Sequence, residues 1–309
     1  MKLYDKSFLD LDSQTAAYDN AAAVILPLPF EGGISYKAGT AHAPEAILDA
    51  SHYVELYDEI LKIEAYHMGI ATVAPPDIFS VSDPQKASEQ IADLSKLFIK
   101  DKKLIAAVGG DHSVTTGCVQ AYLEFFPALS VIQLDAHADL RESYEENRFS
   151  HACTMARIRD LTQQTLQIGI RSMAAEEAER VEKEGISLCT MHEYRQGLFD
   201  VGEALNQLPD PVYVTVDLDV FDWSVILSTG TPEPGGFTWD EGLFLLYTIF
   251  NRKNVIGFDV VELAYQAWDH HSPFAVAKLL YKLLGFKLHK KIVDEEIVLP
   301  IHPQGSLFY

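Results

Sequence analysis

The sequence predicts an α/β fold, a three-layer α/β/α sandwich built around a mainly parallel sheet of eight strands. Short apolar runs alternate with longer amphipathic segments along most of the 309 residues, which is typical of strand-helix-strand units. Ligand-type polar residues follow several of the runs directly, as expected where a parallel sheet gathers a site at its carboxyl strand ends. No linker, repeat or change of composition divides the chain, so we expect a single domain over residues 1–309.

Eight apolar runs have the length and composition of buried strands. They are Ala21–Pro29, His67–Val73, Leu104–Val108, Leu129–Leu134, Thr165–Arg171, Ile186–Cys189, Val212–Val216 and Val255–Val261. Because most of them are separated by helical segments, the connections favour a parallel sheet with helices on both faces.

Helices are expected between these strands. The first begins near Pro44, because a helix tolerates proline in its first turn. Its inward side chains are predicted to be Ala46, Ile47 and Val54. Further helices are predicted over 113–126, from about 152, and over 174–184.

A long amphipathic helix is predicted to start at Ser82, which can cap it, and to end near Ile99. The side chains expected on its apolar face are Ile91, Leu94 and Leu97.

Composition and charge argue against several kinds of partner. A net charge of −21 would repel nucleic acid and anionic membranes, so we expect neither as a partner. No apolar run approaches the roughly 20 residues that span a bilayer, and the N-terminal stretch lacks the apolar core of a signal peptide. The cysteines Cys118, Cys153 and Cys189 have no metal-binding or redox spacing, which predicts reduced thiols and a cytoplasmic protein.

The strongest chemical signal is the segment VIQLDAHADLR at residues 131–141. Its apolar part ends in Asp135, His137 and Asp139, three ligand-type side chains at alternate positions. Alternate residues of an extended chain share a face, so all three can point the same way. Carboxylates and imidazole without thiolates suit a divalent ion of borderline hardness.

Two other predicted strands end in similar clusters. His112 lies in GGDHS after the run that ends at 108, and Asp217 and Asp219 lie in DLD after the run that ends at 216. The six side chains are too many for one tetrahedral zinc. With bridging carboxylates they suit two ions roughly 3.5 to 4 Å apart that share a water. Any one of them alone would be a solvated acid or a core histidine, so the prediction of a metal centre depends on the whole set.

These motifs resemble the signature segments of the ureohydrolases, the arginase and agmatinase family. GGDHS, DAHAD, TVDLDVFD, GTPEPGG and GFDVVE occur in the family's order, and the resemblance runs from about Pro27 to about Leu284. It implies an arginase-like fold and a hydrolase with two Mn²⁺ ions per subunit, which splits a guanidino group to urea and an amine. It also implies a homo-oligomer, a trimer or a hexamer.

The resemblance assigns a role to each candidate residue. Glu262, after the last strand, would pair with the planar guanidinium, although a supporting carboxylate is the alternative. His151 would move protons, and Asp139 is the third catalytic candidate. The proposed ligands of one ion are His112, Asp135, Asp139 and Asp217, and those of the other are Asp135, His137, Asp217 and Asp219.

The loop RESYEENRFSHAC at 141–153 bears on the substrate. Arginase-like members carry S-G-N-x-H-G here, which contacts the amino acid part of arginine, whereas this loop is acidic and similar to the agmatinase type. We therefore predict a small cationic guanidino substrate, agmatine, which is hydrolysed to putrescine and urea. The atypical segment Trp223–Ser228 leaves guanidinobutyrate, guanidine and arginine open. The loops expected to form the rim of the pocket are 30–43, 141–150, 221–237 and 264–273.

Two other classes of function stay open. A metal-dependent deacetylase of related fold would need one zinc position, whereas His112 and Asp139 indicate a second position. A non-catalytic binding protein could keep the fold, although the complete ligand set disfavours it. Release of urea distinguishes the three.

Overall fold

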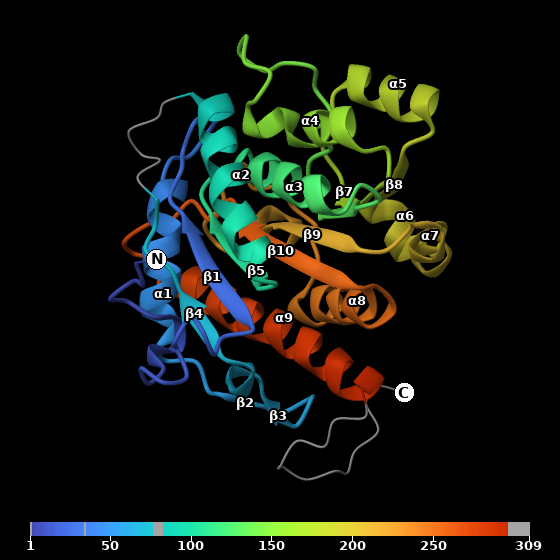
Figure 1. The fold of residues 1–309 in the computed structure, drawn as a ribbon. Coiled ribbons are helices and arrows are strands. Elements are labelled where there is room, and N and C mark those ends of the chain that lie inside the picture. The colour runs from blue at the N-terminus through green and yellow to red at the C-terminus, as the bar shows by residue number, and fades with distance from the viewer. Residues whose placement is uncertain (1, 34, 77–82, 296–309) are drawn as a thin grey trace.

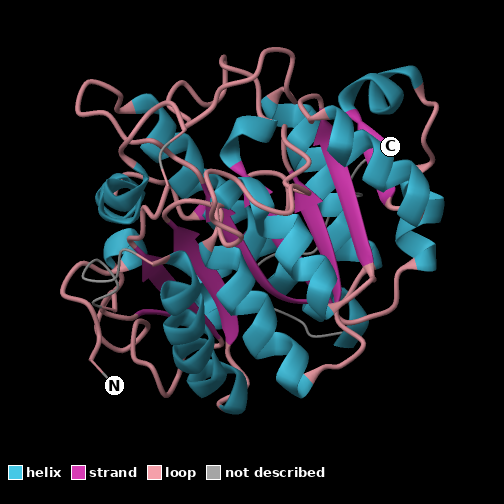
Figure 2. Cartoon of the chain, turned by 90° about the horizontal axis from the view of Figure 1, so that it is seen from above, coloured by secondary structure: helices cyan, strands magenta, loops and turns pink. Residues whose placement is uncertain are grey.

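The computed structural model describes residues 2–33, 35–76 and 83–295. Within them, an eight-stranded sheet has the order β4-β1-β5-β10-β9-β6-β7-β8, and every pairing in it is parallel. Helices cover both faces of the sheet (Figures 1 and 2), so the predicted three-layer fold is confirmed. The strands are β1 (Ala23–Leu28), β4 (Ile70–Thr72), β5 (Leu104–Gly109), β6 (Ser130–Leu134), β7 (Thr165–Ile170), β8 (Ser187–Thr190), β9 (Val212–Asp217) and β10 (Val255–Val261).

Two helical layers enclose the sheet. On one face lie α1 (Ala43–Ser51), α6 (Met191–Gln196), α7 (Val201–Gln207), α8 (Trp239–Arg252) and α9 (His271–Glu295). On the other lie α2 (Pro84–Lys100), α3 (Val114–Phe125), α4 (Thr154–Leu161) and α5 (Ala175–Glu184). Short 3₁₀ turns are η1 (Phe8–Asp10), η2 (Thr40–His42), η3 (Ala65–Met68), η4 (His151–Cys153) and η5 (Leu218–Val220), and β2 (Tyr57–Asp58) pairs with β3 (Ile63–Glu64) in a separate hairpin.

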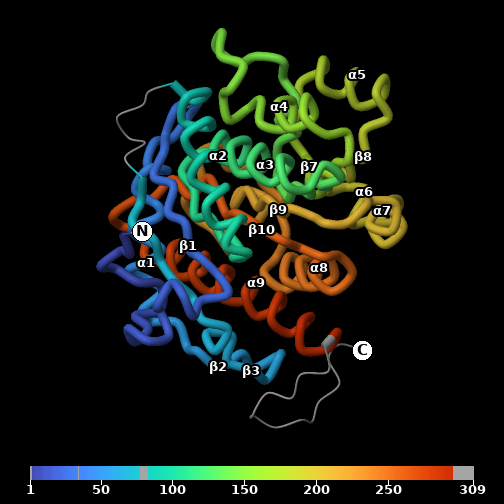
Figure 3. The backbone as a smooth tube through the Cα atoms, viewed as in Figure 1, coloured from blue at the N-terminus to red at the C-terminus, as the bar shows by residue number. Residues whose placement is uncertain are grey.

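The two cores follow from the period of two along each strand. In β1, Ala23 and Ile25 pack toward α1 and α9, whereas Val24, Leu26 and Leu28 pack toward α2 and α3. Full burial of each large aliphatic side chain contributes about 1.5 to 3 kcal/mol. The layer that contains α1 and α9 joins segments far apart in sequence, as the blue and red tubes of Figure 3 show.

The long helix α2 differs from its prediction in one side chain. Ile91 is buried and Leu94 is partly buried, but Leu97 is 51% exposed, so its predicted inward position is wrong. Six residues at about 100° each place Leu97 about 120° away from Ile91 around the helix axis. The predicted cap, Ser82, lies outside the described residues, and the side chain of Asp83 accepts the capping hydrogen bond from the Gln85 N–H instead.

Two further predictions differ in detail, one about the inward side chains of α1 and one about the start of β4. In α1, Ile47 is buried as expected and so is Val54 after it, but Ala46 is only partly buried and Leu48 occupies the core. The predicted strand from residue 67 begins at Ile70, because Gly69 has a φ of 73° and ends the preceding turn η3.

The structure also bears on the cysteines and on membrane-spanning helices. All three cysteines are free and buried. Among the described residues, no helix is both long and apolar enough to cross a bilayer.

A buried ion pair joins α9 to the hairpin region and gives a test of stability. Lys282 Nζ lies 3.0 Å from Asp58 Oδ1, and both residues are about 2% exposed. We expect Lys282→Met to lower the free energy of unfolding by roughly 3 to 5 kcal/mol, because it leaves the Asp58 carboxylate without its cation. Denaturant unfolding measures this. The matched control is Lys6→Met, which breaks an exposed pair with Glu45 and should cost less than about 1 kcal/mol. Equal losses in the two variants would contradict the prediction.

Candidate active site

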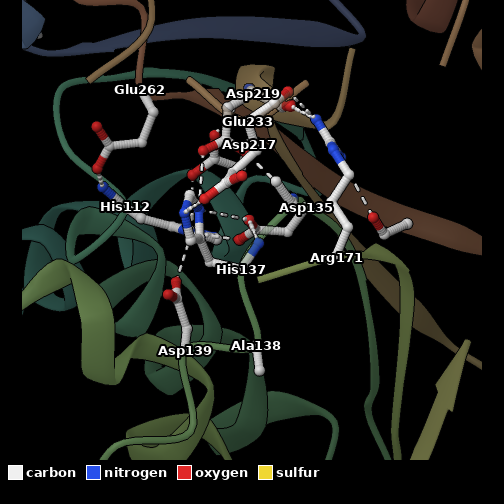
Figure 4. A network of polar contacts seen from close by, with 12 residues as sticks. His112, Asp135, His137, Ala138, Asp139, Arg171, Asp217, Asp219, Glu233 and Glu262 are labelled. Carbon is white, nitrogen blue, oxygen red and sulfur yellow. Dashed lines mark hydrogen bonds and ion pairs between the residues drawn. The ribbon is translucent and has the colours of Figure 1, made fainter. Parts of the chain in front are cut away.

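Four adjacent strands in the middle of the sheet carry the candidate residues at their carboxyl ends (Figure 4). Because β5, β10, β9 and β6 are neighbours and parallel, the loops after them meet above the same edge. The structure brings together all six predicted ligand residues and Glu262 there. They are His112 after β5, Asp135, His137 and Asp139 after β6, Asp217 and Asp219 at the end of β9, and Glu262 after β10.

The first group of side chains surrounds His112. Its Nδ1 atom lies 3.0 Å from Asp139 Oδ2, 3.2 Å from Asp135 Oδ2 and 3.3 Å from Asp217 Oδ2. All four residues are buried, and Nδ1 has no hydrogen-bond partner among the described residues. A buried ring nitrogen without a partner, facing three carboxylates, fits coordination of a metal ion.

The second group surrounds His137, whose side chain is 25% exposed. Its Nδ1 atom lies 2.9 Å from Asp219 Oδ2 and 3.7 Å from Asp135 Oδ1. Asp135 therefore presents one oxygen to each histidine, as a bridging ligand would. Two sets of atoms could each hold an ion, one on His112, Asp135 and Asp139 and one on Asp135, His137 and Asp219.

The charges of this cluster also fit two divalent cations. Burial, followed by repulsion from neighbouring carboxylates, raises the pKa of Asp217 well above its ordinary value and also raises that of Asp139. Burial opposes a charged His112, but the adjacent carboxylates of Asp135, Asp139 and Asp217 outweigh this and raise its pKa. The cluster thus favours added positive charge, and two divalent ions would balance its four carboxylates.

Buried polar groups orient the candidate ligands, and sequence reasoning did not identify most of them. His112 Nε2 lies 3.0 Å from Thr215 Oγ1, so the ring can donate to the hydroxyl while Nδ1 faces the carboxylates. Gln133 donates to Asp135 Oδ2 at 2.6 Å and is itself held by Gln167. A glutamine two positions before a ligand, on a strand otherwise apolar, is the signal that could have revealed this support.

Arg171, at the end of β7, is another residue that the sequence reasoning missed. Its guanidinium donates to the main-chain oxygens of Asp219 and Glu233. These bonds fix the turn after β9 to the loop that closes over it. A lone arginine directly after a buried strand carries no specific sequence signal.

Two of the candidate residues have strained backbones. Asp139 has a φ of 53° and Glu262 a φ of 68°, in the left-handed region that side chains disfavour. Glu262 is buried, and its Oε1 atom accepts a hydrogen bond from the His112 N–H at 2.7 Å. Burial raises the pKa of Glu262 well above its ordinary value, with repulsion from Asp111 in the same direction.

His151 lines the same cavity. Its Nε2 atom is 2.6 Å from Ser35 Oγ, and the ring of Tyr144 packs edge-on with a centroid distance of 6.1 Å. Burial lowers the pKa of His151, which favours the neutral ring at neutral pH.

The cavity itself has a volume of about 210 Å³. Ser35, Tyr144 and Thr231 line it, so three of the four predicted rim loops contribute. The fourth loop, 264–273, lines a separate hollow beside α1 instead. Within the atypical segment, Trp223 is half exposed and Ile226 is buried in the core, and neither lines the cavity.

Comparisons with known proteins identify the family. Its profile matches residues 21–285. The chain belongs to the arginase family. It is 38% identical to the N(1)-aminopropylagmatine ureohydrolase of Synechocystis sp., a match that covers 91% of this chain and 94% of the relative. It is 34% identical to the agmatinase of Pyrococcus horikoshii, over 92% of this chain and 99% of the relative.

Solved structures agree with this assignment. The agmatine ureohydrolase of Thermoplasma volcanium superposes with a TM-score of 0.80 at 27% identity, over 92% of this chain and 95% of that one. The arginase-family chain is thus a hydrolase that acts on amidino carbon-nitrogen bonds and a ureohydrolase of guanidino substrates. The family is one of binuclear metal enzymes, and the His and Asp groups described above fit such a centre.

The support of His112 by Thr215 can be tested directly. We expect Thr215→Val, which keeps the side-chain shape and removes the hydroxyl, to weaken Mn²⁺ binding by about 10 to 100-fold. Metal titration of the apo-protein measures this. Thr162→Val is the control, since Thr162 is also buried and donates to the Leu129 carbonyl oxygen away from the site. A similar loss of affinity in both variants would show that the effect is a general loss of stability.

Proposed function

We propose that this arginase-family hydrolase cleaves agmatine to putrescine and urea. The observation that carries the proposal is that one cavity is lined by members of both His and Asp groups together with Glu262 and His151. A metal pair, an anion for the guanidinium and a group that moves protons are the three functions that this reaction requires.

The proposed cofactor is a pair of Mn²⁺ ions held by the six His and Asp residues. Oxygen-dominated ligation with two histidines and no thiolate favours Mn²⁺ over Zn²⁺. Two such ions, when bound, lower the pKa of water and supply hydroxide near neutral pH. Asp135, with one oxygen toward each histidine, is the proposed bridge together with Asp217.

Glu262 is proposed to hold the guanidinium of the substrate. Its buried carboxylate lines the cavity, and an anion in a dry site pairs strongly with a planar cation. The raised pKa of Glu262 means that its ionised form is costly without a cation nearby. A bound guanidinium would therefore stabilise the ionised form of Glu262, and the ionised carboxylate would in turn stabilise the bound guanidinium.

His151 is proposed to deliver the proton that the leaving amine needs. The neutral ring can carry a proton between solvent and the cavity, and its contact with Ser35 Oγ fixes its orientation. Asp139, which faces both His112 and the cavity, is the third proposed catalytic residue.

The distal ammonium of agmatine is proposed to lie near the hairpin Tyr144–Asn147, where Glu145 and Glu146 are exposed. Arg141 also lines the cavity, but Glu176 and Glu177 lie 3.4 and 3.9 Å from it and offset its charge. The second candidate substrate is N(1)-aminopropylagmatine, favoured by the 38% identity to the Synechocystis enzyme of that name.

Other features of the protein stay predictions. One sheet carries both hydrophobic cores, which supports a single domain over residues 1–309. We still expect a trimer or hexamer, a cytoplasmic location and no nucleic acid partner, on the sequence arguments given above.

The metal assignment predicts two equivalents of Mn²⁺ per chain after manganese supplementation, as measured by elemental analysis. We expect Asp135→Asn to lose at least one equivalent and all measurable urea release, because it weakens the bridge between both ions. The control Asp240→Asn changes an exposed aspartate and should keep both properties. Full activity with one equivalent or none would contradict the assignment.

The proposed role of Glu262 predicts that a variant without its charge binds metal normally but uses the substrate poorly. Glu262→Gln keeps the oxygen that accepts from the His112 N–H and removes the negative charge. We expect kcat/KM for urea release to fall about 100-fold or more, with Mn²⁺ content unchanged. Glu179→Gln is the control, because Glu179 is exposed on α5 and does not line the cavity. Loss of metal from Glu262→Gln would assign this carboxylate a supporting role instead.

Substrate choice is tested by urea release with agmatine, N(1)-aminopropylagmatine, arginine, guanidinobutyrate and guanidine. We expect agmatine to exceed arginine at least 100-fold in kcat/KM, because the loop lacks the arginase-type amino acid contacts and Glu176 and Glu177 offset the charge of Arg141, its cation in the cavity. A clear preference for N(1)-aminopropylagmatine would select the second candidate. A preference for arginine or guanidinobutyrate would contradict the interpretation of the loop and point to Arg141 as an anion partner.

A further inference from the structure

A second hollow lies at the opposite end of the sheet from the active site. Its volume is about 400 Å³, about twice that of the catalytic cavity. Its apolar walls come from the first residues of β5 and β10, the end of α3 and the last turns of α9. The side chains concerned are Leu104, Tyr122, Phe126, Ile256 and Leu288.

This hollow is separate from the proposed chemistry. Leu104 begins β5 and lines the hollow, whereas Gly109 ends the same strand beside the catalytic loop. Five residue steps at about 3.3 Å each place the two ends roughly 16 Å apart. A ligand in the hollow would therefore not touch the metal ligands.

Four lysines surround the apolar walls, which is unexpected in a chain of net charge −21. Lys103 is fixed by hydrogen bonds to the carbonyl oxygens of Tyr18 and Ala21. Lys102 and Lys291 have exposed side chains, and neither makes a hydrogen bond or ion pair with any described residue. Lys102 and Lys291 thus line the hollow with ammonium groups that no described side chain binds.

Lys287, the fourth of these lysines, is partly buried at the wall. Its Nζ atom lies 3.3 Å from the Asn254 side-chain oxygen, a neutral partner. Burial lowers the pKa of Lys287, and repulsion from Lys290 and Lys291 acts in the same direction, whereas Asp294 and Asp210 act against it. An anion at this position would relieve the repulsion.

We propose that the hollow binds a small amphiphilic anion, a medium-chain fatty acid or a carboxylate of that type. The apolar tail would fill the space between Tyr122, Ile256 and Leu288, and the carboxylate would lie among the lysines. Concave pockets of a few hundred Å³ with apolar walls and a few convergent charges are typical of small-ligand sites. The concave shape favours a free amphiphile over a flat lipid surface.

Calorimetric titration of the full chain with dodecanoate tests the proposal. We expect saturable binding of dodecanoate, at least tenfold weaker binding of dodecyltrimethylammonium, which has the same tail and the opposite charge, and no detectable binding of acetate. Equal binding of the two dodecyl compounds, or no binding of dodecanoate, would overturn the proposal.

Variants locate the bound molecule. Lys102→Glu with Lys291→Glu should weaken dodecanoate binding at least tenfold, whereas the control Lys86→Glu with Lys183→Glu changes the same charge on exposed faces of α2 and α5. Ala22→Phe, which fills the hollow from an exposed position, should weaken it similarly. Urea release should be unchanged in all of them and reports that each variant is folded. Unchanged dodecanoate binding in Ala22→Phe, or equal losses in the two lysine pairs, would place the ligand elsewhere.

Discussion

The arrangement of the whole site depends on the mutual repulsion of four buried aspartates. Two unit charges about 4 Å apart repel by about 4 kcal/mol at the effective dielectric constant of a partly solvated protein site. Asp135, Asp139, Asp217 and Asp219 can stay this close only because their backbones belong to strands and turns that are buried on both faces. Positive charge from the histidines and from metal ions then offsets the repulsion. The parallel sheet holds the aspartates close together, and the cations make that arrangement stable.

The same requirement explains why so much of the surrounding structure is polar or strained. Gln133 and Thr215 are fully buried on central strands, where burial of a polar side chain costs more free energy than burial of an apolar one. Each of them contacts a candidate ligand. Asp139 and Glu262 keep a left-handed backbone that costs of order 1 to 3 kcal/mol each. These costs are local, whereas the aliphatic cores on both faces of the sheet extend over the whole molecule. Their combined burial offsets the cost of the site.

The sequence predicted those parts of the structure that depend on local spacing. The eight strands follow from the length and composition of the apolar runs. The six ligand-type residues follow from their position after such runs and, for Asp135, His137 and Asp139, from their spacing at alternate positions. What depends on tertiary neighbours was not predictable in this way. Arg171 acts through main-chain oxygens of distant loops. The helices α6 to α9 are not among the predicted helices. The middle of α9 is buried on nearly every side, so no one-sided apolar pattern identifies it. In contrast, α8 has a one-sided buried face and a capping box of Thr238 and Glu241, so its sequence does carry a local signal. Leu97 illustrates the opposite case, because an apolar residue on α2 lies outside the buried face.

In the proposed reaction, the choice between substrates would depend on a different part of the site from the one that carries out catalysis. Agmatine and N(1)-aminopropylagmatine present the same guanidino group, so the proposed roles of Glu262 and of the metal centre would be the same for both. They differ only in the far end of the molecule, where the second carries one more amine. That end must leave the buried cavity past Tyr144 and reach the hairpin that bears Glu145 and Glu146. Both glutamates have left-handed φ angles, of 49° and 63°, which a tight turn imposes and which fix where the backbone presents their side chains. In the proposed reaction, discrimination between the two candidate substrates would therefore depend on the charge and reach of this hairpin, and the metal centre would contribute little to it.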